Sequence, residues 1–263
     1  MKAEAATPTE PFLAVCIDNA VTAMGLCENG SVASTWTVST HSPITADEVH
    51  LLLHDFLRVR ELAHPVGSIM CSVVPSVADA WREGLGIVTG SKPLIVGPGL
   101  KSGIAMGYKD PGQMGGDRVA CAVAAREQFG VPIIVVDFGT VTTLTVVNEE
   151  GVLLGGAIAP GIGIAMESLC DNAAQLAEVS MQVPRTAIGR STAEAIRAGV
   201  VMGEAARVDG LVGAIWDELG YETKLVATGS FAASACKLTS HEFALCDDLA
   251  LQGLRLIYER NSR

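Results

Sequence analysis

The sequence predicts an α/β protein built from two related lobes, and two observations support this. Strand-like runs alternate with helical runs along the chain. The pattern of strand, turn and strand at residues 12–38 also returns at residues 132–160. The length of 263 residues suits one large domain or two smaller ones, at about 150 residues per domain.

The first half predicts an antiparallel meander followed by helices and further strands. Strands are expected at 12–17, 21–27 and 31–38, and Asn29-Gly30 is typical of a two-residue hairpin turn. Thr45 and Glu48 have the spacing of a capping box, so a helix is expected from Thr45 through the apolar periodic segment 49–59. A strand at 68–74, a helix near 77–85 and a short strand at 93–96 follow.

A glycine-rich stretch at residues 97–118 separates the halves. Long loops without secondary structure inside a domain are usually functional. A helix is expected at 117–130, closed by Gly130. The second half then predicts strands at 132–147 and 152–160 around a turn at 148–151, and a long helix at 193–216 that Thr192 could cap.

The two meanders can be overlaid without gaps by a shift of 121 positions, which is 137 minus 16. The second copy has what a phosphate-binding turn needs. Gly139 lets backbone N–H groups approach an anion, Thr140 offers a hydroxyl, and Asp137 can hold a cation. The first copy resembles the same device with substitutions. The overlaid pairs are Asp137 on Cys16, Gly139 on Asp18, Thr140 on Asn19, Thr143 on Thr22 and Gly151 on Gly30.

Composition argues against several classes of protein. The formal charge of −11 and the pI near 4.9 disfavour nucleic acid as a partner. Charges interrupt every long apolar run, so no membrane span is expected, and residues 1–11 lack the apolar centre of a signal peptide. Seven scattered cysteines without a C-x-x-C pair indicate buried thiols in a reducing cytoplasm.

Eight segments, in order along the chain, carry a specific resemblance. They are CSVVPSV, VGPGLKSG, GYKDPGQMGGDRVACAVAA, VVDFGTVTT, GGAIAPGI, STAEAIRAG, ATGS and DDLALQGLRLIYERN. In these segments the sequence is similar to the type III pantothenate kinases, bacterial enzymes of the superfamily of acetate and sugar kinases, heat-shock ATPases and actin.

The resemblance implies an actin-like ATPase fold, with two ribonuclease-H-like lobes and ATP in a cleft between them. The lobes are expected at 1–116 and 117–263, with the last helix free to pack back on the first lobe. It also implies a cytoplasmic homodimer with pantothenate bound near the subunit interface, Mg²⁺ with the ATP, and a monovalent cation such as potassium or ammonium.

The activity that the resemblance implies is transfer of the ATP γ-phosphoryl group to pantothenate, the first step of coenzyme A biosynthesis. Asp117 takes the place of the general base, because a primary hydroxyl is a poor nucleophile until a carboxylate accepts its proton. Arg118 would bind the carboxylate or amide region of pantothenate. Gly115 and Gly116 leave the backbone open beside them, although the family commonly has alanine at position 116.

The remaining expected site residues are assigned to pantothenate, to the monovalent cation or to ATP. Tyr108 and Thr192 match positions that line the pantothenate pocket. Asp137 matches the ligand of the monovalent cation. On the ATP side, the matching residues are Asn19, Gly139 and Thr140.

The first phosphate motif departs from the family. Where the family reads D-x-G-N-T, this chain has Cys16-Ile17-Asp18-Asn19-Ala20, so only Asn19 survives. Asp18 lies on the same side of the strand as Cys16 and could hold the magnesium ion instead. Smaller departures are Ser191 for asparagine and Ser230 for glycine. An alternative function therefore stands beside the kinase: a non-catalytic paralogue that binds a ligand or partner as a regulator.

Simpler roles compete for most of these residues. Asp117 could serve only the helix N-terminus, and Asp137 could form only an Asx turn. Arg118 could be a surface residue, and Tyr108 could pack under its loop.

Two further features have simple interpretations. Cys16 is expected to be a small buried hydrophobe rather than a reactive thiol. His50 and His54 have the i, i+4 spacing of metal ligands, but a solvated helix face is the expected reading, since no H-E-x-x-H pattern is present.

Overall fold

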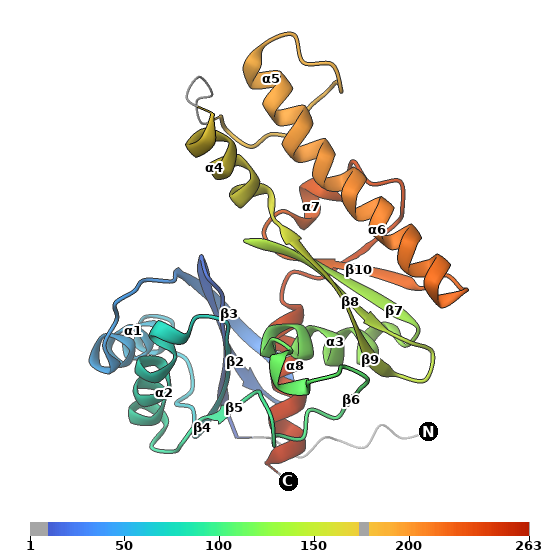
Figure 1. The fold of residues 1–263 in the computed structure, drawn as a ribbon. Coiled ribbons are helices and arrows are strands. Elements are labelled where there is room, and N and C mark those ends of the chain that lie inside the picture. Colours follow the sequence, from blue (N-terminus) through green and yellow to red (C-terminus); the bar gives the residue numbers. More distant parts are fainter. Residues whose placement is uncertain (1–9, 174–178, 263) are drawn as a thin grey trace. The chain divides into compact units, whose positions relative to one another are not determined.

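The computed structural model describes residues 10–173 and 179–262, and these form two compact units (Figure 1). Within these ranges, unit 1 contains residues 10–104, 108–124 and 249–262. Unit 2 contains residues 105–107 and 125–248. The lobe boundary between 116 and 117 stays a prediction.

Unit 1 is built on a five-stranded sheet in the order β3-β2-β1-β4-β5. The first three strands form the predicted antiparallel meander, and β4 and β5 continue the sheet in parallel. Asn29 and Gly30 have φ values of 50° and 73°, as a two-residue hairpin requires. The strands are β1 (Phe12–Ile17), β2 (Val21–Glu28), β3 (Ser31–Ser39), β4 (Gly67–Ser72) and β5 (Leu94–Ile95).

Helices cover both faces of this sheet. On one face, Leu13, Val15 and Ile17 of β1 join the apolar core formed with α1 (Ala46–Val59) and α2 (Pro75–Thr89). The alternate residues of β1 point to the other face, because side chains alternate along a strand. There Phe12 stacks on Tyr258 of α8 (Leu249–Asn261), with ring centroids 3.9 Å apart.

The capping box at the start of α1 is confirmed. The Thr45 hydroxyl accepts the Glu48 backbone N–H at 3.3 Å, and the Glu48 carboxylate accepts the Thr45 backbone N–H at 2.7 Å. Each side chain thus satisfies a backbone donor that the first helical turn leaves free.

The glycine-rich stretch is more ordered than a loop without secondary structure. It contains β6 (Ala105–Met106), which pairs with a strand of unit 2, and the short 3₁₀ helix η1 (Pro111–Gln113). The Asp110 side chain accepts the Gly112 N–H at 3.0 Å and so caps η1. Helix α3 (Gly116–Phe129) follows, and Gly130 closes it as predicted, with φ 77°.

Unit 2 repeats the sheet plan of unit 1. Its order is β11-β10-β7-β8-β9-β6, so β9-β8-β7-β10-β11 corresponds to β3-β2-β1-β4-β5 and β6 is added at an edge. This correspondence supports the internal repeat proposed from the sequence. The new strands are β7 (Ile133–Phe138), β8 (Val141–Val147), β9 (Val152–Pro160), β10 (Lys224–Thr228) and β11 (Ala244–Leu245).

The gapless overlay of the two meanders needs one correction. In unit 1 the last pair before the turn is Ile17 with Thr22, whereas in unit 2 it is Phe138 with Thr142. The turn of unit 2 is therefore one residue shorter. Thr142, and not Thr143, takes the place of Thr22, and both of these threonines are buried.

The long helix expected at 193–216 is interrupted. A π-helical segment, η2 (Ala198–Met202), lies between α5 (Thr192–Arg197) and α6 (Gly203–Leu219). The predicted N-cap is also wrong by one residue: the Ser191 side chain accepts the Glu194 N–H at 3.3 Å, and Thr192 is the first residue of the helix. The other helices of unit 2 are α4 (Ile162–Asn172) and α7 (Ala232–Ala235).

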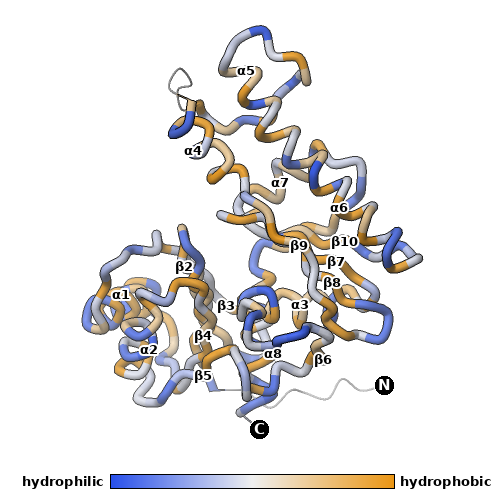
Figure 2. The backbone as a smooth tube through the Cα atoms, viewed as in Figure 1, coloured by the Kyte–Doolittle hydropathy of each residue, from blue (hydrophilic) through white to orange (hydrophobic). Residues whose placement is uncertain are grey.

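Hydrophobic residues concentrate in the central strands, which are mostly orange in Figure 2. In unit 2 the apolar core joins β7 and β8 to α6 and α7. Across residues 10–173 and 179–262, no helix has the length and apolar character needed to cross a membrane.

The packing of α8 on α3 generates a prediction. A Cβ atom on Gly253 would overlap the backbone of Ala120, so Gly253→Ala is expected to destabilise the protein by about 1–3 kcal/mol through overpacking. Gly210 of α6 has open space around it, so the matched control Gly210→Ala should raise stability by up to about 1 kcal/mol. Urea denaturation of both variants measures this, and equal stability changes would contradict the close packing.

Candidate functional site

Two glycines bring the start of α3 close to the sheet of unit 1. A Cβ atom on Gly116 would lie 2.9 Å from the Cβ of Cys71 and 3.2 Å from the carbonyl oxygen of Val96. A Cβ atom on Gly115 would overlap the Oδ1 atom of Asp117. The pair GG in GGDR is therefore a packing requirement, and this chain leaves no room for the alanine that the family commonly has at 116.

Asp117 sits in the first turn of α3, in surroundings that disfavour its charge. Burial raises the pKa of Asp117 above its usual value, and the nearby negative charge of Asp18 raises it further. The backbone N–H of Arg118 acts in the opposite direction. The Oδ1 atom is buried and has no hydrogen-bond partner among the residues that the structure describes. Hydrogen bonding at the helix N-terminus therefore does not explain the position of the Oδ1 atom.

Arg118 is not the surface residue of the simpler interpretation, because only 7% of it is exposed. Burial lowers the pKa of its guanidinium, while Asp117 and Tyr108 raise it. Tyr108 is half-buried and lies close enough to interact electrostatically with Arg118. Three of the predicted acceptor-side residues thus gather in unit 1.

The turn between β1 and β2 is closed by its own side chains. The Asp18 Oδ1 atom accepts the backbone N–H of Asn19 at 2.6 Å and the Asn19 side-chain amide at 3.3 Å. Behind the turn, the Thr40 hydroxyl donates to the Asp18 carbonyl at 2.7 Å and lies 2.9 Å from the Thr22 hydroxyl. Asp18 therefore occupies the donors of Asn19, which a phosphate-binding turn would present to an anion.

The corresponding turn of unit 2 is surrounded by backbone instead of by its own side chains. Asp137 ends β7, and Gly139 and Thr140 form the turn to β8. A Cβ atom on Gly161 would overlap the carbonyl oxygens of Gly139 and Thr140, and one on Gly229 would overlap the Asp137 carboxylate. Backbone from three segments therefore converges around the DFGT turn.

Gly161 and Gly229 were not among the site residues predicted from the sequence. Both lie in segments that carried the resemblance, GGAIAPGI and ATGS, so the signal was present. Gly229 has φ 95°, a conformation that a residue with a side chain rarely adopts.

A hydrogen bond from α6 holds the end of β9. Arg207 of α6 donates to the carbonyl oxygen of Pro160 and forms an ion pair with Glu204, which is only 2% exposed. The backbone N–H of Gly161, the residue after Pro160, donates to the Thr140 carbonyl at 3.2 Å. The hydrogen bond from Arg207 to Pro160 therefore lies next to the residue that contacts the DFGT turn.

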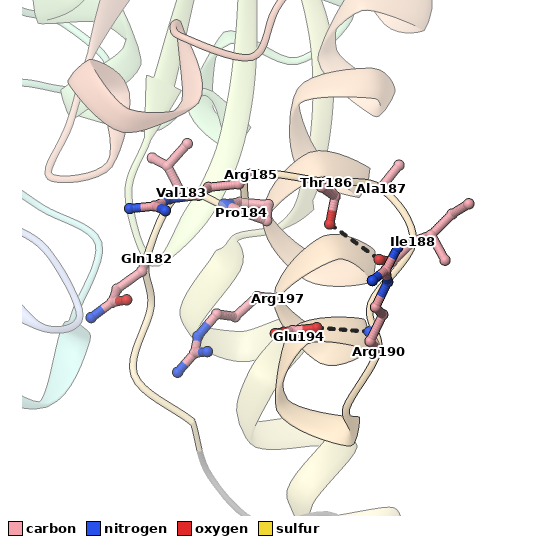
Figure 3. A pocket seen from close by; sticks show the side chains of 10 residues that line it. All are labelled: Gln182, Val183, Pro184, Arg185, Thr186, Ala187, Ile188, Arg190, Glu194 and Arg197. Carbon is pink, nitrogen blue, oxygen red and sulfur yellow. Dashed lines mark hydrogen bonds between the residues drawn. The ribbon is translucent and has the colours of Figure 1, made fainter.

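Thr192 lies at the exposed start of α5, beside a pocket of about 890 Å³. Figure 3 shows the loop of residues 182–190 running beside α5. The loop is tied by Thr186 to the Ile188 carbonyl, and the Arg190 N–H donates to Glu194 at 2.7 Å. The pocket is lined by Gln182, Val183, Pro184, Arg185, Thr186, Ala187, Ile188, Arg190, Glu194 and Arg197.

The predicted site residues divide between the two units. The described contacts bring Asp117, Arg118 and Tyr108 together with Asp18. Unit 1 holds Asn19, Tyr108, Gly115, Gly116, Asp117 and Arg118, and unit 2 holds Asp137, Gly139, Thr140 and Thr192.

Two of the simpler interpretations can be compared with the structure. Cys16 is buried in β1, as expected. His50 and His54 lie on α1 with ring centroids 6.3 Å apart, and no group of three or more metal-ligating side chains occurs in the described part of the chain.

Comparison with known proteins decides the family. A sequence profile for type III pantothenate kinases matches residues 12–214. The chain belongs to the type III pantothenate kinase family. A type III pantothenate kinase from Brevibacillus brevis is 40% identical over 252 residues, which cover 95% of this chain and 99% of the relative. One from an Anaeromyxobacter species is 39% identical over 252 residues, which again cover 95% of this chain and 99% of the relative.

Solved structures show the fold of this pantothenate kinase family member. An inorganic polyphosphate/ATP-glucomannokinase from Arthrobacter aligns with a TM-score of 0.54 and 14% identity, covering 96% of this chain and 100% of that one. Together with the repeated sheet order, this likeness confirms the predicted fold class, α/β with two ribonuclease-H-like lobes of the actin-like ATPase fold.

The raised pKa of Asp117 generates a stability prediction. Because the folded protein disfavours the ionised carboxylate, Asp117→Asn should increase the free energy of unfolding at neutral pH. The gain should disappear below pH of about 4, where the carboxyl is protonated in both the folded and the unfolded state. Denaturant titrations at several pH values test this, with the exposed Asp217→Asn as control. A loss of stability at neutral pH would show that the charge of Asp117 is favourably compensated.

Proposed function

We propose that this protein transfers the γ-phosphoryl group of ATP to pantothenate, the first step of coenzyme A biosynthesis. The observation that carries the proposal is the Asp117 carboxylate, whose buried Oδ1 atom has no described hydrogen-bond partner and whose pKa is raised. Membership of the type III pantothenate kinase family supplies the reaction and the substrates.

Asp117 is assigned as the general base. Its free oxygen can accept the proton of the pantothenate hydroxyl as that oxygen attacks the γ-phosphorus. A raised pKa suits the task, since a carboxylate with higher proton affinity is a stronger base. Glycine at position 115 leaves the space beside this oxygen free of a side chain.

Arg118, Tyr108 and Thr192 are assigned to pantothenate. The buried guanidinium of Arg118 next to Asp117 suits a carboxylate or amide oxygen, because its planar donors can bind such a group through two hydrogen bonds. Tyr108 interacts with the same arginine and could pack along the ligand. The assignment of Thr192 rests on its family position alone.

Asn19, Gly139 and Thr140 are assigned to ATP. The glycine-lined turn after β7 offers backbone groups and the Thr140 hydroxyl to phosphate oxygens. In this structure the backbone N–H and the side-chain amide of Asn19 both donate to the Asp18 carboxylate. Asn19 can bind ATP only if these two hydrogen bonds break.

Two cations belong to the proposal. Mg²⁺ with ATP would neutralise charge on the phosphates, and the Asp18 carboxylate fits it, because Mg²⁺ prefers carboxylate oxygens and the charge of Asp18 reaches the neighbourhood of Asp117. Asp18 would thus stand in for the acid lost at Cys16. Asp137 would hold the monovalent cation, potassium or ammonium. A homodimer and a cytoplasmic location complete the proposal.

The competing function is a non-catalytic paralogue that binds a ligand or partner as a regulator. One observation favours it: the Asp18 carboxylate occupies donors at the first phosphate turn and places negative charge there. If that contact persists in solution, it would oppose the binding of a triphosphate. Separate titrations with Mg-ATP and with pantothenate distinguish the two functions, since only the kinase requires both to bind.

Removal of the proposed base tests the reaction directly. Asp117→Asn should lower pantothenate-dependent ADP release by about 10²–10⁴-fold, because the amide cannot accept the proton. The control Asp79→Asn, at an exposed position on α2, should keep normal turnover. Unchanged turnover in Asp117→Asn would remove the assigned base, and ADP release without pantothenate would remove the assigned acceptor.

Restoration of the family motif tests the first turn. Cys16→Asp combined with Asp18→Gly should tighten Mg-ATP binding by about tenfold, which corresponds to roughly 1.4 kcal/mol of relieved repulsion and regained positioning. Calorimetry measures the dissociation constant, and Asp18→Asn alone separates the two roles of this carboxylate, since weaker Mg-ATP binding indicates a magnesium ligand and tighter binding indicates repulsion. No gain in the double variant would show that this turn does not limit nucleotide binding.

A further inference from the structure

Two cysteine thiols lie side by side under the first phosphate turn. Cys16 of β1 is directly opposite Cys71 of β4 in the parallel pairing of these strands. Their sulfur atoms are 3.5 Å apart, with the Cys71 thiol donating to the Cys16 sulfur. Neither residue has a role in the proposed phosphoryl transfer. Cys16 stands where the family has an aspartate, so the pair is a feature of this chain and not of the family motif.

The backbone already has the spacing of a cystine. Neighbouring strands lie about 4.7–4.9 Å apart, within the roughly 4.4–6.8 Å between Cα atoms that disulfides span. The sulfurs need to approach by about 1.5 Å to reach the bond length of about 2 Å, a distance that side-chain rotation can supply. Formation of the bond therefore requires no separation or sliding of the two strands.

The two thiols differ in access. Cys16 is 8% exposed and lies at the end of β1, next to the Asp18 turn, whereas Cys71 is only 1% exposed. Hydrogen bonding to Cys16 and burial raise the pKa of Cys71, so Cys71 keeps its proton. Cys16 is consequently the sulfur that a small oxidant would meet first, and Cys71 is placed to resolve the product.

We infer that Cys16 and Cys71 form a reversible disulfide modification site whose oxidant is a small hydroperoxide. The Cys16 sulfur attacks one peroxide oxygen, the O–O bond breaks, and a sulfenic acid and one water (or alcohol) result. The Cys71 sulfur then attacks the Cys16 sulfur, the S–O bond breaks, and a second water leaves with the Cys71 proton. Two thiols are oxidised by two electrons and one peroxide is reduced by two. A dithiol reductant reverses the modification by exchange.

The neighbours of Cys71 connect the site to the candidate base. The Cβ of Cys71 packs where the start of α3 approaches the sheet, and Asp117 is close enough to influence the Cys71 thiol electrostatically. A bond between the sulfurs would tie the strand end that carries the Asp18 turn to the strand that supports Gly116. This inference goes beyond the proposed kinase activity, since the bond can form whether or not the protein binds ATP.

The test maps the bond in the full chain. Native protein is treated with hydrogen peroxide, free thiols are alkylated, and the unreduced digest is analysed by mass spectrometry. We expect a peptide that joins Cys16 to Cys71, with the loss of two hydrogen atoms and of two titratable thiols. The link should vanish after treatment with dithiothreitol. Cys71 joined to Cys121 instead, or Cys16 oxidised to sulfinic acid without a link, would overturn the inference.

Variants guard against a misleading result. Cys71→Ala and Cys16→Ala should each abolish the link. If one of these two variants fails to fold, the other still provides the test. Cys27→Ala is the matched control, because Cys27 is also buried in the sheet of unit 1 but lies on β2. It should retain the link in full. A disulfide from Cys16 to another cysteine that forms equally well in Cys71→Ala, or loss of the Cys16–Cys71 link in folded Cys27→Ala, would contradict the assignment.

Discussion

The absence of side chains at positions 115 and 116 is the constraint on which the candidate site of unit 1 depends. Because Gly116 packs against Cys71 and Val96, the first turn of α3 lies directly on the sheet. That close approach buries Arg118 and the Oδ1 atom of Asp117, and leaves this oxygen without a described partner. A buried carboxylate oxygen without a partner is costly for stability, and this is the observation on which the proposed role of Asp117 rests.

The strand, turn and strand that begin each sheet are alike in topology but differ in the residues at the turn. Both units start their sheets with a strand, a turn and a strand, and both continue in the same strand order. In unit 2 the turn is surrounded by close backbone at Gly161 and Gly229, and no carboxylate takes the position of Asp18, which is Gly139 there. In unit 1 the Asp18 carboxylate takes the place of the anion and binds the Asn19 donors itself. Asp18, where the overlay with unit 2 has Gly139, therefore places a negative charge at the turn of unit 1.

Sequence reasoning was accurate where the determining interactions are local. The capping box of Thr45 and Glu48, the hairpin at Asn29-Gly30 and the close of α3 at Gly130 all depend on residues within one turn of each other. It failed at three other points. The one-residue difference between the two β-turns is invisible to a gapless overlay, and Ser191 rather than Thr192 caps α5. The interruption of the following helix at 198–202 has no local signal that we can identify.

The sequence by itself determined the family, the α/β class and the identities of the candidate site residues, because motifs and short-range periodicity are properties of neighbouring residues. Only the tertiary structure decided that Arg118 is buried, that Asp18 occupies the donors of Asn19 and raises the pKa of Asp117, and that Cys16 faces Cys71. The physical reason is that burial, electrostatic shifts and thiol pairing arise between residues from separate strands and helices. Their proximity is set by the packing of the whole unit, which no local pattern encodes.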